Sequence, residues 1–62
     1  MQEASSLMTY YLQYKTPRGA TNVLPYGDKD LAAHAAHSLR ENHNIEPLLY
    51  IHNGVGVVHL PF

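Results

Sequence analysis

One segment in the middle of this chain has the periodicity of a helix, and its position between two strand-like segments restricts the fold more than any other feature. At 100° per residue its apolar side chains form a single stripe, made up of Leu31, Ala32, Ala35, Ala36 and Leu39. The opposite side carries Asp30, His34, His37 and Glu41. Because most of the stripe is alanine, we expect one helix that lies close against a single layer of strands.

Both ends of this helical segment carry capping residues. Asp28 can accept a hydrogen bond from the first free backbone N–H groups, and Asp30 adds favourable charge in the first turn. Residues 42–44 read Asn-His-Asn, and asparagine readily adopts the left-handed conformation that closes a helix. The sequence therefore predicts both the start and the end of the helix.

Ahead of the helix, residues 7–15 alternate between two faces in the manner of a strand. One face holds Met8, Tyr10, Leu12 and Tyr14, and the other holds Thr9, Tyr11, Gln13 and Lys15. In the turn that follows, Pro17 presets φ and Gly19 can take the left-handed position that closes a three-residue loop.

This turn predicts the pairing of a first hairpin. Tyr14 should lie opposite Asn22, and Leu12 opposite Leu24. We expect a short return strand over residues 20–24 that Pro25 ends. A plain loop over residues 16–27 is the competing interpretation.

After the helix, residues 48–52 and 55–60 flank Asn53-Gly54, the strongest short signal for a hairpin with a two-residue turn. The predicted register places His52 opposite Val55 and runs on to Leu48 opposite His59. One face is then wholly aliphatic, with Leu49, Ile51, Val58 and Leu60. We expect this face to meet the helix, with Gly56 leaving room for a close approach and Pro61 ending the strand.

The predicted order of elements is therefore ββαββ. Short connections and a helical crossover favour an antiparallel four-stranded sheet in the order 2-1-3-4, with one helix on one face. This is an open two-layer α+β sandwich. Residues 1–6 are expected to form a flexible leader, and residues 7–62 a single small domain.

Composition excludes several classes of function. The chain has 62 residues, no cysteine and a formal net charge of −1. This balance gives no long-range field for DNA, and no apolar run approaches the roughly 20 residues of a membrane span. The start of the chain carries no positive charge and leads into no long hydrophobic run, so it does not resemble a secretory signal and we expect a cytoplasmic protein.

The candidate catalytic and metal-binding residues form no convincing site. His34 and His37 are weak candidates for metal ligands. With Asp30 and Glu41 they extend over three turns of the helix, which is too long for the ligands of one tetrahedral ion. A solvent-exposed polar face of the helix explains these residues better. Ser5, Ser6 and Ser38 lie in the leader or on the helix, away from any strained nucleophile turn. We therefore expect no enzymatic activity and no cofactor.

The sheet face away from the helix is the best candidate for a working surface. It should gather residues from all four strands, namely Thr9, Tyr11, Gln13, Thr21, Val23, Leu48, Tyr50, His52, Val57 and His59. Tyrosine-rich, weakly charged surfaces are typical of protein interfaces. The predicted partner-binding residues are Tyr11, Gln13, Tyr50, His52, Val57 and His59.

Three interpretations of this face remain open. In the first, the chain is a small regulatory protein that forms a homodimer or binds an unidentified protein partner through the face. In the second, Tyr11 and Tyr50 stack on bases of a single-stranded nucleic acid, with Lys15 and Arg18 as the nearby cations. In the third, the face is an ordinary exposed sheet, since tyrosine and valine favour strands in any case.

Overall fold

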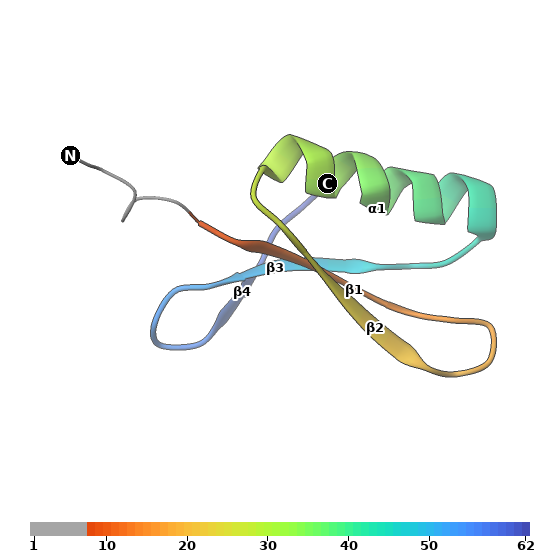
Figure 1. Ribbon diagram of the computed structural model, residues 1–62, viewed down its shortest axis with the longest axis horizontal. Helices are drawn as coiled ribbons and strands as arrows, with labels where there is room; N and C mark the ends of the chain where they lie inside the picture. The colour runs from red at the N-terminus through yellow and green to blue at the C-terminus, as the bar shows by residue number, and fades with distance from the viewer. Residues whose placement is uncertain (1–7) are drawn as a thin grey trace.

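The computed structural model describes residues 8–62 and confirms the predicted α+β fold. The elements follow one another as β1 (Tyr10–Lys15), β2 (Thr21–Tyr26), α1 (Lys29–His43), β3 (Leu48–His52) and β4 (Val57–His59). All neighbouring strands are antiparallel, and their order in the sheet is β2-β1-β3-β4. The helix lies along one face of this open sheet (Figure 1). The predicted leader, with Ser5 and Ser6, lies outside the described residues.

The first hairpin has the predicted register. Tyr14 lies opposite Asn22 and Leu12 opposite Leu24. The Thr16 N–H donates to the Ala20 carbonyl at 2.7 Å, and Gly19 has a φ of +90°. The left-handed glycine is what allows so short a loop to close, and the competing loop interpretation is wrong.

The predicted end of this hairpin was wrong, because β2 continues through Pro25 to Tyr26. Thr16 and Ala20 form a hydrogen-bonded pair, and such pairs alternate along an antiparallel ladder with pairs that exchange no hydrogen bond. Tyr11 and Pro25 fall on a position of the second kind. The missing N–H of Pro25 would point away from β1 on this edge strand, so proline costs the ladder nothing.

Helix α1 begins and ends at the predicted caps. The Asp28 carboxylate accepts a hydrogen bond from the Asp30 N–H at 2.8 Å. At the other end Asn44 adopts a φ of 59°, in the left-handed region, and the Ile45 N–H donates to the Leu39 carbonyl at 3.1 Å. These contacts satisfy backbone groups that have no partner inside the helix.

The helix meets the sheet along a line slightly rotated from the predicted one. Ala32 and Ala36 are fully buried, and they face a core whose large members are Leu12 and Leu49. Leu31, which the periodicity placed in the apolar stripe, is 60% exposed, so this part of the prediction was wrong. The helix contacts the sheet through the small alanines because they allow the closest approach of the two layers. Leu31 lies beside this line of contact and stays exposed.

The second hairpin exists as predicted, but its register was wrong by two residues. Ile51 lies opposite Val58 and His52 opposite Val57, and the Asn53 N–H donates to the Gly56 carbonyl at 3.1 Å. The central residues of the turn are therefore Gly54 and Val55, not Asn53 and Gly54. Of these two only Gly54, at +89°, has a positive φ, which is the feature of a type II′ turn.

The cause of this shift is the side chain of Asn53. Its Oδ1 accepts hydrogen bonds from the N–H groups of Val55 and Gly56, both at 3.0 Å, and this holds Asn53 in front of the turn. A shift of two residues keeps each side chain on its predicted face, because the period of a strand is two. Val58 therefore still points to the helix side of the sheet.

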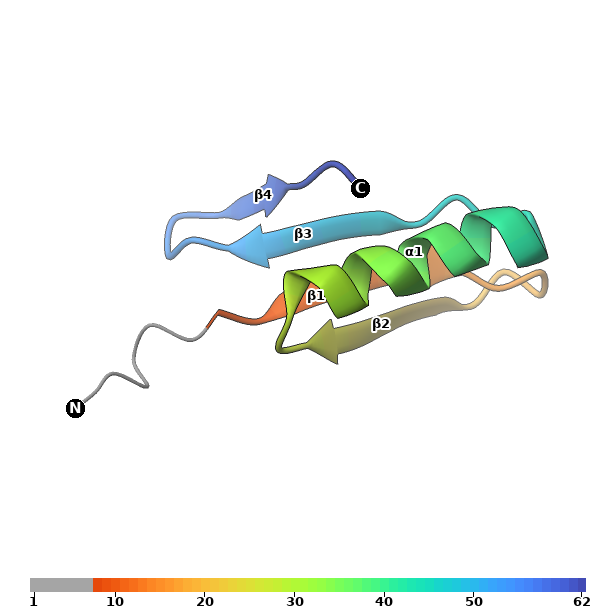
Figure 2. The same ribbon diagram turned by 90° about the horizontal axis from the view of Figure 1, so that it is seen from above.

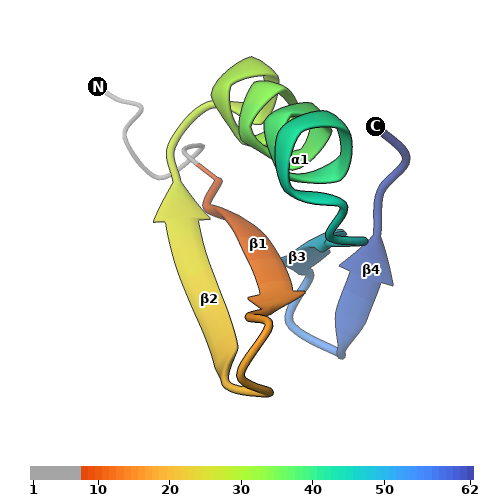
Figure 3. The ribbon, with the colours of Figure 1, turned by 90° about the vertical axis from the view of Figure 1, so that its right-hand side faces the viewer.

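The helix covers the sheet unevenly. It packs on β1, β2 and β3, while β4 lies beyond it at the edge of the sheet (Figure 2). The chain after β4 rises toward the helix (Figure 3), where the Phe62 ring lies 4.5 Å from the Arg40 guanidinium carbon. The His37 ring meets Phe62 edge-on with centroids 5.5 Å apart. Arg40 also pairs with Glu46 at 2.6 Å.

Candidate protein-binding face

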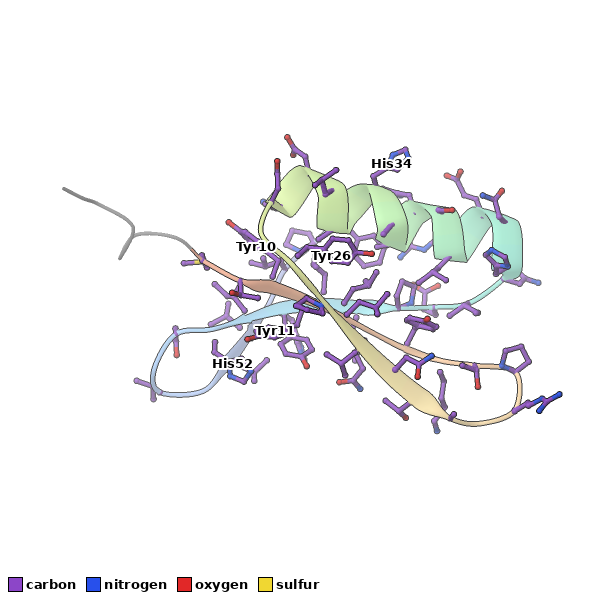
Figure 4. All side chains as sticks on the ribbon, in the orientation of Figure 1. Tyr10, Tyr11, Tyr26, His34 and His52 are labelled. Carbon is purple, nitrogen blue, oxygen red and sulfur yellow. The ribbon has the colours of Figure 1, made fainter. Side chains whose placement is uncertain are left out.

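The sheet has one face toward the helix and one open face, and strand alternation decides which side chain belongs to which. Tyr10 and Tyr26 lie between sheet and helix, whereas Tyr11 and His52 lie on the far side of the sheet (Figure 4). The register then places all the predicted partner-binding residues on this open face, namely Tyr11, Gln13, Tyr50, His52, Val57 and His59. The sequence pattern was sufficient to bring them together.

Four aromatic rings form a continuous cluster at the centre of the open face. Tyr11 lies directly opposite Tyr50 across β1 and β3, and their rings stack at 5.5 Å with an interplanar angle of 21°. His52 meets Tyr11 edge-on at 5.2 Å, and Tyr50 edge-on at 5.8 Å. His59, opposite Tyr50 on β4, completes the cluster at 6.1 Å.

The geometry of paired strands explains why these rings touch. Residues opposite each other on antiparallel strands have Cβ atoms about 5 Å apart, and long side chains also reach their diagonal neighbours. Such contacts restrict the rotamers of both tyrosines before any partner arrives. We call the rings of Tyr11, Tyr50, His52 and His59 the aromatic cluster.

Apolar side chains surround the aromatic cluster and remain substantially exposed. Val57 is 49% exposed, and Leu48 is 46% exposed. Val23 on β2 is exposed to a similar degree and lies opposite Gln13. Leu48 and Val23 were on the predicted face but not among the predicted binding residues. Their apolar character on an alternating face was the signal that could have included them.

Charge on the open face is confined to one end. Lys15 lies at the end of β1 opposite Thr21, and Arg18 is in the adjoining turn. Lys15 is four residues from Tyr11, a separation of about 13 Å along a strand. Among the described residues of this face there is no aspartate or glutamate. The aromatic cluster therefore has neutral surroundings.

The helix histidines lie elsewhere and make different contacts. His34 is exposed on the outer side of α1 (Figure 4), while His37 packs on Phe62. Within residues 8–62 there is no group of three His, Cys, Asp or Glu side chains placed to hold a metal ion. Ser38 accepts a hydrogen bond from the Asn42 side-chain amide at 3.2 Å.

Comparison of the chain with known protein families, with curated proteins and with solved structures found no match. In the part of the chain that the structure describes, no helix has the length and apolar character needed to cross a membrane. The open face is thus interpreted from its own chemistry.

Proposed function

We propose that this protein is a small non-catalytic interaction module that binds another protein chain through its open sheet face and acts by covering part of that protein's surface. The observation that carries the proposal is the aromatic cluster, whose rings are held together at 5.2–6.1 Å on a neutral face. Tyrosine is enriched where protein interfaces concentrate their binding energy.

The physical argument rests on preorganisation and on the apolar rim. The tyrosine rings already restrain one another. Binding a partner therefore costs less tyrosine side-chain entropy than it would on a surface with unrestrained side chains. Val57 and Leu48 extend the apolar area outward from the cluster. A contiguous exposed apolar patch of this kind is typical of an interaction site.

Site-specific cross-linking in cells that express the protein tests this proposal. A photoreactive phenylalanine analogue in place of Gln13 lies on the open face, and the same analogue in place of His34 lies on the outer side of the helix. We expect illumination to attach one discrete protein at position 13 and none at position 34. Tyr50→Glu in the position-13 variant should abolish the product, because it places a charge inside the aromatic cluster.

The same variants can overturn the proposal. Equal labelling at positions 13 and 34, or an unchanged product after Tyr50→Glu, would show that the open face is not the binding surface. A single-stranded oligonucleotide titration at two salt concentrations tests the nucleic-acid interpretation with Lys15 and Arg18. Tight binding whose affinity falls steeply at high salt would indicate that the partner is a nucleic acid and not a protein.

A further inference from the structure

The edge of the sheet formed by β4 carries backbone groups that no strand within residues 8–62 satisfies. Asn53 pairs with Gly56, and the Leu60 N–H donates to the Leu49 carbonyl at 2.8 Å, so Gly56, Val58 and Leu60 direct their backbone groups toward β3. By the alternation of an antiparallel ladder, Val57 and His59 direct their N–H and C=O groups outward.

These outward groups form a short edge with defined ends. On one side the Val55 N–H is already bonded to the Asn53 side chain. On the other side Pro61 has no N–H to offer. The free N–H donors of this edge are therefore those of Val57 and His59, placed symmetrically on either side of Val58.

We propose that β4 pairs with β4 of a second copy of this chain, antiparallel and about a twofold axis that passes through Val58. In that register Val57 exchanges both of its backbone hydrogen bonds with the second copy's His59, and the symmetry-related pair does the same. The outward N–H and C=O groups of Val57 and His59 are then all paired, and Pro61, which has no N–H, leaves no donor without a partner.

Side chains along β4 fit this register. Val58 faces the helix side but is 38% exposed, because the helix does not cover β4. On the axis it would pack against its own copy at the closer of the two ladder spacings. Leu60 would lie opposite the second copy's Gly56, where an added Cβ would meet no atom within 4 Å and open space is present.

Charge also favours this edge. Residues 47–62 contain no Asp, Glu, Lys or Arg. Edge strands that avoid self-pairing commonly carry lysine or another charge. A twofold axis through β4 brings no like charges together. Charge repulsion therefore does not oppose pairing of this strand with a second copy.

The other edge of the sheet is less suited to the same contact. In β2 the outward positions include Pro25, and the residue between the free donors of Thr21 and Val23 is Asn22. A twofold axis there would place two asparagine side chains against each other in place of two valines. The Asn22 amide already donates to the Tyr14 hydroxyl at 3.3 Å.

The proposed dimer leaves the open face accessible. The twofold axis of an antiparallel strand pair is perpendicular to the sheet, so both helices lie on one side and both aromatic clusters on the other. Val57 would lie beside the second copy's His59 at the junction. This inference is independent of the proposed function, although the dimer would double the surface that the proposed function uses.

Backbone N-methylation of chemically synthesised chain tests the edge without changing any side chain. N-methyl-Val57 removes an outward donor that β3 does not use, and N-methyl-Val23 is the matched control on β2. In sedimentation velocity over a range of concentrations, we expect the unmodified chain and the control to form a dimer that dissociates on dilution. N-methyl-Val57 should remain monomeric, with an unchanged circular dichroism spectrum.

A second variant keeps the test decisive if methylation disturbs folding. The chain has no cysteine, so Val58→Cys introduces a single thiol. Its Cα would lie about 4.5 Å from that of the second copy, within the range that a disulfide spans. Mild oxidation should therefore give a disulfide-linked dimer with native circular dichroism, and much less of it from the control Asn22→Cys.

Three results would overturn the proposal. They are a concentration-independent monomer, a dimer that Val23 methylation abolishes and Val57 methylation does not, and equal oxidation of the two cysteine variants. Tyr50→Glu separates this inference from binding through the open face, since it should abolish the cross-link at position 13 and leave the β4 dimer intact. Loss of the dimer with Tyr50→Glu but not with N-methyl-Val57 would indicate face-to-face association instead.

Discussion

Each of the two hairpins of this protein has a glycine-containing turn that predicts its register, yet only one has the predicted register. In β1–β2 the Thr16 Oγ1 accepts one hydrogen bond, from the N–H of its own paired residue Ala20 at 3.1 Å, so the predicted register is kept, and Gly19 takes the expected positive φ. In β3–β4 the asparagine of the turn also acts through its side chain, which accepts from two backbone N–H groups. This extra interaction moves the turn one residue along the chain.

The hairpins also differ in how the rest of the fold covers them. Helix α1 packs on β1 and β2, whereas β4 lies outside its reach. Val58 is consequently more than a third exposed, although it points to the helix side. The comparison shows that a turn dipeptide predicts a hairpin, while the hydrogen bonds of a turn side chain decide its register and the position of the helix decides the burial of its strands.

A charge placed between the helix and the sheet should have the largest effect, because it disrupts the packing of α1 on the first hairpin. Ala36 is fully buried, so Ala36→Asp would leave a carboxylate without a partner in the core. We expect a loss of more than about 3 kcal/mol, enough to unfold a domain of this size. Thermal unfolding by circular dichroism measures it, with His34→Ala as the silent control. Similar melting temperatures for the two variants would contradict the observed phase of the helix.

Truncation of adjacent leucines in β3 should give the next largest effect. Leu49 is 1% exposed and faces the helix, whereas Leu48 is 46% exposed on the open face. Leu49→Ala should cost about 2–4 kcal/mol through lost burial and a residual cavity. Leu48→Ala should cost less than about 1 kcal/mol. Urea unfolding of both variants measures the difference, and equal losses would show that the two faces of β3 are equally buried.

A glycine substitution in each hairpin turn sharpens the comparison between them. Gly54→Val and Gly19→Val both place a β-branched residue at positive φ, and each should cost about 1–3 kcal/mol. Gly56→Val, where φ is not positive and the space is open, should cost less than about 0.5 kcal/mol. Chemical denaturation of the three variants provides the test. A larger loss at Gly56 than at Gly54 would place the turn elsewhere.

The smallest expected effect concerns the side chain that distinguishes the second turn from the first. Asn53→Ala removes two hydrogen bonds at 3.0 Å, but both freed N–H groups are exposed and can bond to water. We therefore expect a loss of about 0.5–1 kcal/mol. Amide hydrogen exchange at Val55 and Gly56 should accelerate, while exchange at Leu12 and Leu49 changes only with global stability. Unaltered exchange at both turn residues would contradict the role of Asn53.

Much of the fold and of the candidate site followed from local patterns. The two-residue period of β1 separates Tyr10 and Leu12 under the helix from Tyr11 on the open face. Asp28 and Asn44 cap the two ends of the helix, where backbone groups have no partner inside the helix. The aromatic cluster follows from the same alternation, since Tyr11 and Tyr50 are direct neighbours across two strands.

The remaining features depend on contacts between distant parts of the chain. Pro25 stays in β2 because its position on the edge of the sheet leaves its missing N–H unneeded, and only the assembled sheet defines that edge. Leu31 is exposed because the rotation of the helix follows the closest packing of Ala32 and Ala36 on the strands. Phe62 reaches Arg40 because the sheet brings the end of the chain beside the helix.

The amino-acid sequence by itself determined which elements form, where the helix is capped and which face of the sheet each strand side chain occupies. These properties depend on periodicity and on hydrogen bonds between residues close in the chain. The tertiary structure decided the rotation of the helix, the exposure of β4 and the place of Pro25 in an edge strand. These differ because several arrangements satisfy the same local pattern, and competition among packing contacts selects one of them.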